Sequence, residues 1–569
     1  PVPVPVPVEL RARAEAWMSA DPDPATRAEM AELLSAGDTA ALHERFDQPL
    51  TFGTAGIRGA MGAGPARINR LVVRRTATGL SRYLLAHEER AAERGVVVGR
   101  DARHGSAAFA AELAGVVSAH GLVVRSIERA LPTPITAFAV RQLGAAGGAM
   151  VTASHNPASD NGVKVYVSDG AQVLPPDDEE ISAAAALPGP RDLPAPTGSG
   201  GPRAGRVEPV DEDDLLGAYR AAALRLVEHG TTRELSVVYT PLHGVGGAIV
   251  PDLLVAAGFD APAVVAAQAE PDPDFPTLAF PNPEEPGALD LAIADAARTG
   301  ADIVLANDPD ADRLAVAVPD GERGWRVLTG DEIGILLADH LVSSSFGRGR
   351  LVATTIVSST MLAALAAERG VDYAETLTGF KWIARAAAGR PGYRLLFGYE
   401  EALGFAVSDA VADKDGMSAA LVVADIAARA KASGETLADL LDDLSCRLGV
   451  HESAQWSLRL DGPDAPRAMA AIVERLRSAP PARLAGLEVT EVVDLAAGAR
   501  GTPPTDAVVL RAGDRARVVV RPSGTEPKLK AYLLVTTPPV DRGTLGEARR
   551  RASALLAALR DDVRRLCGE

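Results

Sequence analysis

Cysteine is nearly absent from this chain of 569 residues, and it also lacks long apolar runs. Cys446 and Cys567 lie far apart and form no CxxC pair, which argues against a disulfide framework and against a zinc site. No apolar run reaches the ~18 residues of a membrane span, and the PVPVPVPV start lacks the basic and apolar regions of a signal peptide. We therefore expect a cytoplasmic protein that spans no membrane, with an extended, unpacked Pro-Val tail.

A basic surplus is missing too, because the formal net charge is −17. Nucleic-acid binders normally carry a basic surplus or a basic face, so we expect no nucleic-acid partner. An acidic protein that binds an anion must concentrate Arg, Lys, backbone amides or a metal locally. Small basic loops are therefore the places to look for a site.

Apolar, β-branched runs alternate with Ala- and Leu-rich stretches that favour helices. This alternation predicts α/β domains in which helices cover the faces of a sheet. The apolar runs are VVVG (96–99), AMVT (149–152), LSVVYT (235–240), DIVLA (302–306) and LVATTIV (351–357).

Breaks in composition divide the chain. Residues 187–210 are dense in Pro and Gly, a new helix-then-strand pattern begins near residue 323, and the sequence becomes rich in strands after residue 445. The expected parts are an extended tail and helical lead (1–45), α/β domains over 46–210, 211–322 and 323–445, and an α+β domain over 446–569.

The segment AMVTASHNPASDNGVKVY runs from an apolar strand into a loop that holds Ser154 and His155. Loops at strand ends are where α/β proteins place functional residues. A serine nucleophile needs a base or a charge-stabilising environment, for which His155, Lys164 and Arg58 are candidates. Taken alone, the segment could also be an Asn-Pro turn with capping hydroxyls.

The segment NDPDADRLAV places Asp308, Asp310 and Asp312 at alternate positions between two apolar strands. Three carboxylates on a tight loop can converge on one hard cation. An EF-hand would need Gly and Glu where this chain has Arg313 and Pro319. Mg²⁺ fits better, because it takes few carboxylates and leaves positions for phosphate oxygens. A solvated acidic turn is the alternative.

The segment ARVVVRPSGTEPKLKAYL again reads as strand, loop and strand. Hydroxyls, a glycine and flanking cations are the parts of an anion cradle, although an ordinary turn is the alternative. It is no Walker A loop, because GxxxxGK[ST] occurs nowhere in the chain. The candidate residues are Arg521, Ser523, Gly524, Thr525 and Lys528.

The segment LLFGYEEALGFAV places Glu400 and Glu401 in a glycine-flanked loop after a strand. Carboxylates bind sugar hydroxyls well, because they accept two hydrogen bonds in a fixed geometry. Two further glycine-containing loops, FGTAGIRG and TGFKW, add the cations Arg58 and Lys381. Each of these loops could be structural when taken alone.

In this order, FGTAGIRG, TASHNP, DPDADR, GYEEALG and RPSGTEPK resemble the motifs of the α-D-phosphohexomutase superfamily of phosphoglucomutases and phosphomannomutases. The resemblance extends from about Thr51 to about Tyr532, and five ordered motifs are far more specific than one. It implies three homologous α/β domains with mixed sheets and a smaller C-terminal α+β domain around a central cleft.

The resemblance also implies a role for each candidate residue. Ser154 looks like the phosphoserine, and Ser154, Asp308, Asp310 and Asp312 look like the Mg²⁺ ligands. Lys164 falls at the position of a general acid/base, with Arg58 and His155 beside the phosphoserine. The implied substrate-binding residues are Glu400, Glu401, Lys381, Arg313 and the loop from Arg521 to Lys528 with Ser523, Gly524 and Thr525.

One departure concerns the sugar loop, where Ala402 replaces the serine of many hexomutases and removes a hydroxyl contact. The form GYEEALG and the TGFKW segment are similar to the branch of phosphoglucomutases, phosphopentomutases and glucose 1,6-bisphosphate synthases. The implied activity is an isomerase that moves phosphate between C1 and C6 of glucose, or C5 of a pentose, with a sugar 1,6-bisphosphate as primer. A bisphosphate synthase and a Mg²⁺-dependent phosphatase are the alternatives, and a monomer or a dimer is expected.

Overall fold

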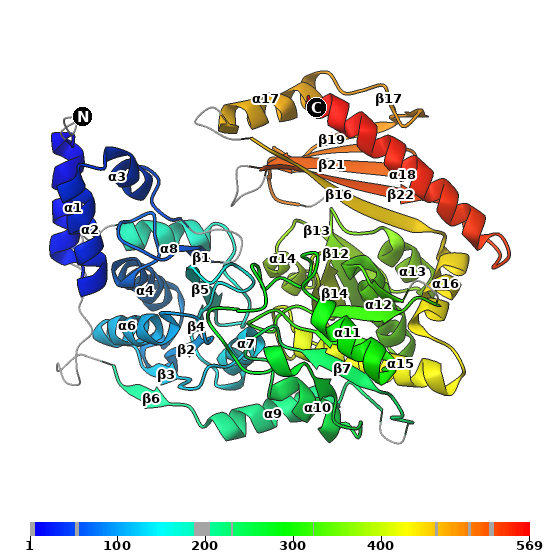
Figure 1. The fold of residues 1–569 in the computed structure, drawn as a ribbon, viewed down its shortest axis with the longest axis horizontal. Coiled ribbons are helices and arrows are strands. Elements are labelled where there is room, and N and C mark those ends of the chain that lie inside the picture. The colour runs from blue at the N-terminus through cyan, green and yellow to red at the C-terminus, as the bar shows by residue number, and fades with distance from the viewer. Residues whose placement is uncertain are drawn as a thin grey trace. The chain divides into compact units, whose positions relative to one another are not determined.

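The computed structural model describes residues 6–51, 56–186, 205–228, 231–321, 324–460, 465–498, 502–522 and 528–568, without the side chain of residue 466. The chain forms two compact units (Figure 1). The first contains Pro1–Arg326 and Asp409–Leu421, and the second contains Val327–Ser408 and Val422–Glu569.

Three helices precede the first sheet, namely α1 (Val8–Ala20), α2 (Pro24–Ala36) and α3 (Thr39–Phe46). Their apolar sides enclose a small core around Trp17, Met30 and Phe46. Val6 is buried in this core and Val8 begins α1, so the expectation of an unpacked tail is wrong for the end of the Pro-Val repeat. The first five residues of the repeat lie outside the described part of the chain.

The first sheet is built around a central strand that pairs in parallel on both sides. β2 pairs in parallel with β3 and β4, β5 returns antiparallel to β4, β1 pairs with β5, and β6 pairs with β3. The strands are β1 (Ile57–Ala60), β2 (Val96–Arg100), β3 (Val124–Ser126), β4 (Gly147–Val151), β5 (Asp160–Val167) and β6 (Val207–Pro209). The helices of this part are α4 (Arg70–His87), α5 (Ala91–Arg94), α6 (Ser106–Ala119), α7 (Thr133–Gln142) and α8 (Asp177–Ala186).

The second and third sheets repeat the pairing of β2 to β5. β7 pairs in parallel with β8 and β9, and β10 returns antiparallel to β9; β12 pairs in parallel with β13 and β14, and β15 returns antiparallel to β14. The strands are β7 (Val237–Thr240), β8 (Ala263–Val264), β9 (Ile303–Ala306), β10 (Ala315–Pro319), β11 (Trp325–Val327), β12 (Arg350–Thr355), β13 (Asp372–Thr376), β14 (Arg394–Glu400) and β15 (Gly404–Ala406). The helices that follow the first sheet are α9 (Glu212–Leu224), α10 (Ile249–Ala256), α11 (Asp290–Thr299), α12 (Gly330–Ser344), α13 (Met361–Arg369), α14 (Phe380–Ala384), α15 (Gly416–Ala432) and α16 (Leu437–Leu448), with a 3-10 turn at Ala266–Gln268.

A fourth sheet is antiparallel, in the order β16-β22-β21-β20-β19. Alternate residues of its strands face two different cores, as the two-residue period of a strand requires. Val518 and Leu533 pack with α17 and α18, whereas Val519 and Tyr532 pack with Ile356 of the third α/β part. The elements are β16 (His451–Arg459), α17 (Ala465–Ser478), β17 (Arg483–Leu484), β18 (Leu487–Glu488), β19 (Glu491–Asp494), β20 (Val508–Ala512), β21 (Ala516–Pro522), β22 (Lys528–Thr536) and α18 (Leu545–Cys567). The prediction of α/β domains with mixed sheets and a C-terminal α+β domain is confirmed.

The three candidate loops of the mixed sheets occupy the same topological position. Each connects a strand that pairs in parallel to the next strand of the chain, which returns antiparallel beside it: β4 to β5, β9 to β10, and β14 to β15. Each also contains a non-glycine residue with a left-handed backbone, namely Ser154 (φ 54°), Ala311 (φ 54°) and Leu403 (φ 61°). This recurrence is what copies of one ancestral domain would show.

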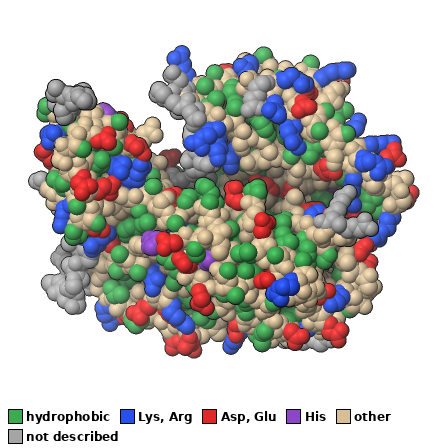
Figure 2. Space-filling model, viewed as in Figure 1, with side chains coloured by type: hydrophobic (Ala, Val, Ile, Leu, Met, Phe, Trp, Pro, Cys, Tyr) green, Lys and Arg blue, Asp and Glu red, His purple; other side chains and the backbone are tan. Residues whose placement is uncertain are grey.

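The described residues include no helix that is long and apolar enough to cross a membrane. On the face of the molecule shown in Figure 2, acidic and basic side chains are interspersed.

Two helical glycines allow a test of the packing. A Cβ added at Gly79 of α4 would lie 2.4 Å from the carbonyl oxygen of Ile181 in α8. A Cβ added at Gly217 of α9 would meet no described atom outside its own helix within 4 Å. Ala favours a helix over Gly by ~1 kcal/mol, so we expect Gly217→Ala to raise the melting temperature. Gly79→Ala should lower it, because overpacking of ~1–3 kcal/mol outweighs that gain. Shifts of the same sign in the two variants, measured by thermal unfolding, would contradict this packing of α4 on α8.

Candidate active site

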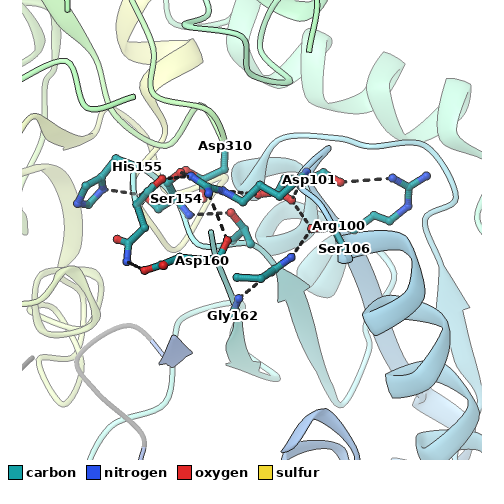
Figure 3. A network of polar contacts seen from close by, with 12 residues as sticks. Arg100, Asp101, Ser106, Ser154, His155, Asp160, Gly162 and Asp310 are labelled. Atoms are coloured by element: carbon teal, nitrogen blue, oxygen red, sulfur yellow. Dashed lines mark hydrogen bonds and ion pairs between the residues drawn. The ribbon is translucent and has the colours of Figure 1, made fainter. Parts of the chain in front are cut away.

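The loop after β4 presents the candidate nucleophile, Ser154, to a carboxylate. Its backbone N–H donates to the Thr152 hydroxyl at 2.9 Å, and the side chain is buried. The Ser154 hydroxyl donates to Asp308 Oδ2 at 3.0 Å and lies 3.1 Å from His155 Nδ1 (Figure 3). The structure thus brings the predicted nucleophile to the predicted metal loop, which lies far from it in the sequence.

The aspartate loop is a tight hairpin connection between β9 and β10. The Ala311 N–H donates to the Asp308 carbonyl at 2.8 Å, and Ala311 has a left-handed φ of 54°. One carboxylate oxygen from each of Asp308, Asp310 and Asp312 lies within 4.8 Å of the others, and all three side chains are buried. The alternate spacing therefore does lead to convergence.

The carboxylates of this loop have the donor atoms and the free coordination capacity of a cation site. Asp310 Oδ1 and Asp312 Oδ1 are buried and have no hydrogen-bond partner within the described ranges. A buried carboxylate oxygen without a partner is unfavourable, and carboxylate oxygens are the ligands that Mg²⁺ prefers. These residues fit a divalent cation.

Lys164 on β5 is the nearest cation to this cluster. Its Nζ lies 2.7 Å from Asp310 Oδ2 and 2.6 Å from Asp312 Oδ2. Burial by itself would lower the pKa of Lys164, but Asp310 and then Asp312 outweigh it and hold that pKa above its ordinary value. Lys164 is therefore a protonated bridge between two carboxylates in this arrangement.

The two ends of the aspartate cluster differ in charge balance. Burial, and then Asp310 and Asp312, raise the pKa of Asp308 well above its ordinary value. Burial would also raise the pKa of Asp312, but Lys164 and then Lys414 outweigh it and hold that pKa below its ordinary value. The two lysines thus form their shortest contacts at the Asp310 and Asp312 end of the cluster.

His155 and Arg58 both contact the nucleophile loop. Burial, and then Arg313 and Arg58, lower the pKa of His155 well below its ordinary value, so its imidazole is neutral. Arg58 on β1 donates to the Asn156 side-chain oxygen at 3.2 Å. The Arg313 backbone N–H donates to Asp308 Oδ1 at 3.0 Å, and the Arg313 guanidinium forms an ion pair with Glu284.

Sequence reasoning missed Lys414, whose Nζ lies 3.3 Å from Asp312 Oδ2. It belongs to the segment Asp409–Leu421, in which Asp413 accepts a hydrogen bond from Tyr166. Gly416 makes the approach possible, because a Cβ there would lie 2.1 Å from the Arg313 carbonyl oxygen. The only signal in the sequence was the charged string DKDG.

The loop HGVGG (residues 243–247) lies in the turn between β7 and α10, and it supports the aspartate loop. The Val245 N–H donates to the Pro309 carbonyl at 2.8 Å. A Cβ on Gly244 would lie 2.4 Å from Pro309 Cα, so a larger residue would displace the loop.

In the second unit, the candidate sugar loop and Arg521, the first residue of the candidate phosphate loop, contact the same short segment, Thr378 and Gly379. Glu400 Oε1 accepts the Gly379 N–H at 2.7 Å, and Arg521 donates to the hydroxyl of the adjacent Thr378. Lys381 is buried at the beginning of α14, two residues after Gly379. Ser523, Gly524 and Thr525 lie outside the described residues, and Lys528 begins β22.

Glu401 is a buried carboxyl next to Glu400. It accepts hydrogen bonds from Ser358 Oγ at 2.9 Å and Thr355 Oγ1 at 3.2 Å. Burial, then Glu400 and Asp331, raise the pKa of Glu401 to about 7. Its protonation state therefore changes near neutral pH.

Comparison with known proteins gives a consistent answer along the chain. Models of the three α/β/α domains of phosphoglucomutase/phosphomannomutase match residues 49–187 (domain I), 218–321 (domain II) and 329–446 (domain III).

Three curated relatives are similar to this chain over most of its length. A "Probable phosphomannomutase" of Haemophilus influenzae is 40% identical over 474 residues, which are 82% of this chain and 92% of that protein. A "Probable phosphoribomutase" of Schizosaccharomyces pombe is 36% identical over 91% of this chain and 92% of its own. A "Phosphoglucomutase" of Staphylococcus aureus is 34% identical over 88% of this chain and 92% of its own. With three domain models matched in order and relatives of this identity, the chain belongs to the phosphoglucomutase/phosphomannomutase family.

Proposed function

We propose that this protein moves a phosphoryl group between the 1-hydroxyl of a sugar and its 6-hydroxyl in glucose, or its 5-hydroxyl in a pentose. Ser154 carries the group, and a sugar bisphosphate is the intermediate. One observation carries the proposal: the Ser154 hydroxyl is hydrogen-bonded to a buried cluster of three aspartates that lies far away in the sequence. The names of the relatives, all phosphosugar mutases, support it.

Charge neutralisation is the chemical task of the residues around Ser154. A phosphorylated serine carries about −1.5 to −2 charge, which must be balanced before a hydroxyl can approach the phosphorus. Asp308, Asp310 and Asp312 would hold Mg²⁺ together with an oxygen on Ser154, and the ion supplies positive charge to the phosphoryl group. Arg58 supplies positive charge on the other side of the loop.

Phosphoryl transfer then takes place in two opposite steps. In the first, the bond between phosphorus and the Ser154 oxygen breaks as a bond to the sugar hydroxyl forms, and the proton of that hydroxyl is passed to the protein. Neutral His155, 3.1 Å from the serine oxygen, is placed to receive or return a proton. Lys164, held protonated between two carboxylates, is placed as the acid partner.

The bisphosphate must turn end for end between the two steps. Its other phosphate then returns to Ser154, and the first phosphate stays on the sugar as product. The non-reacting phosphate binds the loop from Arg521 to Lys528, and Glu400 binds sugar hydroxyls. The contacts of Glu400 and Arg521 with adjacent residues, Gly379 and Thr378, support a shared site for sugar and distal phosphate.

Glucose or a pentose is favoured over mannose by the form of the sugar loop, GYEEALG with Ala402. The phosphoribomutase name of the fission yeast relative and the phosphoglucomutase name of the staphylococcal relative support these two substrates. A glucose 1,6-bisphosphate synthase would use the same residues with another phosphoryl donor. A phosphatase would have no use for a second phosphate cradle.

The Glu401 carboxyl keeps the charge of the sugar loop low. Below pH 7 it is protonated and adds no negative charge beside Glu400. Its hydroxyl partners Ser358 and Thr355 can satisfy either form.

We expect Ser154→Ala to abolish the interconversion of sugar phosphates and to leave the melting temperature within a few degrees of the parent. The variant removes the oxygen that carries the phosphoryl group in this proposal. Turnover of glucose 1-phosphate and of ribose 1-phosphate, each with a catalytic amount of bisphosphate, is the measurement. Undiminished turnover in Ser154→Ala would contradict the proposal, and release of inorganic phosphate by the parent would favour the phosphatase.

We expect a chelator to stop turnover and added Mg²⁺ to restore it. Asp310→Asn should weaken Mg²⁺ binding at least tenfold by calorimetry, because it replaces an anionic ligand with a neutral one. The exposed Asp260→Asn is the matched control and should bind Mg²⁺ as the parent does. Equal affinity in the two variants would rule out the aspartate loop as the metal site.

We expect the stability of the parent to depend on pH through Glu401. Its folded pKa of about 7 lies above the ordinary value of 4.5, so the folded protein keeps a proton that the unfolded chain has lost between these pH values. The free energy of unfolding therefore decreases as pH rises through this window and stays at the lower value above it. Glu401→Gln removes this dependence, so the melting temperature of the variant relative to the parent should increase from pH 4.5 to 7 and then level off. A difference that is constant with pH would show that Glu401 does not titrate there.

A further inference from the structure

Arg103 lies in the loop between β2 and α6, outside every motif to which the sequence assigns a role. It is 5% exposed. Its guanidinium donates to the backbone of the nucleophile loop. Among the described residues, it forms no hydrogen bond with the Ser154 hydroxyl or with the carboxylates of the aspartate loop. Nη2 donates to the carbonyl oxygens of Ser154 (2.7 Å) and Asn156 (2.5 Å), and Nη1 to those of Pro157 (2.7 Å) and Asp160 (3.3 Å).

The guanidinium is itself fixed from two sides. Asp101 Oδ2 lies 3.5 Å from Arg103 Nε, and Asp101 Oδ1 accepts the Arg103 backbone N–H at 3.0 Å and the Ser106 hydroxyl at 2.6 Å. The ring of Phe275 packs on the guanidinium, with 4.8 Å between its centroid and Cζ. Figure 3 shows Asp101, Ser106 and Ser154 within one polar network.

The nucleophile loop needs such a support because Ser154 has a φ of 54°. A left-handed backbone is unfavourable for serine and persists only where the surroundings hold it. A guanidinium is suited to this task, since its five N–H groups point in fixed directions in one plane. A lysine ammonium has three donors without a fixed plane and cannot reproduce the four bonds.

We propose that Arg103 is a positioning residue that holds the Ser154 loop so that the serine oxygen faces Asp308. The proposal rests on the proposed function of Ser154. That oxygen must be in line with phosphorus twice in each turnover, at opposite ends of the same bisphosphate. A misplacement of ~1 Å can reduce a rate ~100-fold, so the loss should lie in the transfer step.

Arg103→Lys and Arg100→Lys form a matched pair for the test. Arg100 precedes the same loop and donates to the carbonyl oxygens of Glu128 and Asp101, but to none in the nucleophile loop. It lies at the far end of the network from Ser154 in Figure 3. We would measure kcat and KM with glucose 1-phosphate or ribose 1-phosphate. We would also measure, by intact mass, the rate at which glucose 1,6-bisphosphate phosphorylates Ser154. Each variant would be assayed at a temperature that lies the same number of degrees below its own melting temperature.

We expect Arg103→Lys to lower kcat and the phosphorylation rate together, on the order of 100-fold, with KM within about threefold of the parent. Arg100→Lys should stay within about threefold in all three quantities. A kcat for Arg103→Lys equal to that of Arg100→Lys would overturn the proposal, as would a loss confined to KM. An inactive parent would instead refute the proposed function.

Phe275→Leu is the second variant in case Arg103→Lys does not fold. It removes the ring that fixes the plane of the guanidinium and leaves all four hydrogen bonds possible. We expect kcat to fall about tenfold with an unchanged KM, as for a smaller misplacement. A folded Phe275→Leu variant with the kcat of the parent would overturn the proposal.

Discussion

Mutual repulsion among three buried aspartates determines which charged residues the first unit must bring together. Asp308, Asp310 and Asp312 come within 4.8 Å of one another out of contact with solvent, so positive charge must reach them from other parts of the chain. Lys164 arrives from the first sheet and Lys414 from a segment far downstream. These ion pairs fix the antiparallel strand β5 against the hairpin of the second sheet, and the nucleophile on the preceding loop is placed as a result.

The repeated sheets explain how one architecture serves three tasks. In each mixed sheet one parallel strand is followed by a strand that returns antiparallel beside it, and the connection between the two carries the nucleophile, the aspartates or the glutamates. Each of these three connections contains a non-glycine residue with a left-handed backbone. The scaffold is shared, and the chemistry differs only in the residues that occupy the same position of the loop.

Contiguous features were predictable from the sequence, and features that depend on distant partners were not. The strand, loop and helix order and the alternating carboxylates are local patterns, and the structure places them as those patterns indicate. The expectation that Arg58 and Lys381 lie in loops is wrong, because Arg58 lies on strand β1 and Lys381 in helix α14. The roles of Lys414, Arg103 and Gly244 depend on contacts with residues that only folding brings near. Local composition carries no information about such contacts. The domain boundaries stay predictions.

The segment Asp409–Leu421 gives this chain an unusual order of assembly. Because it lies after the strands β12 to β15 in the sequence yet belongs to the first unit, no single cut separates the two units. Domains fold from the N-terminus during synthesis, so the aspartate hairpin leaves the ribosome long before Lys414 does. In a nascent chain, the aspartate hairpin consequently lacks the positive charge of Lys414 until the whole third sheet has been translated.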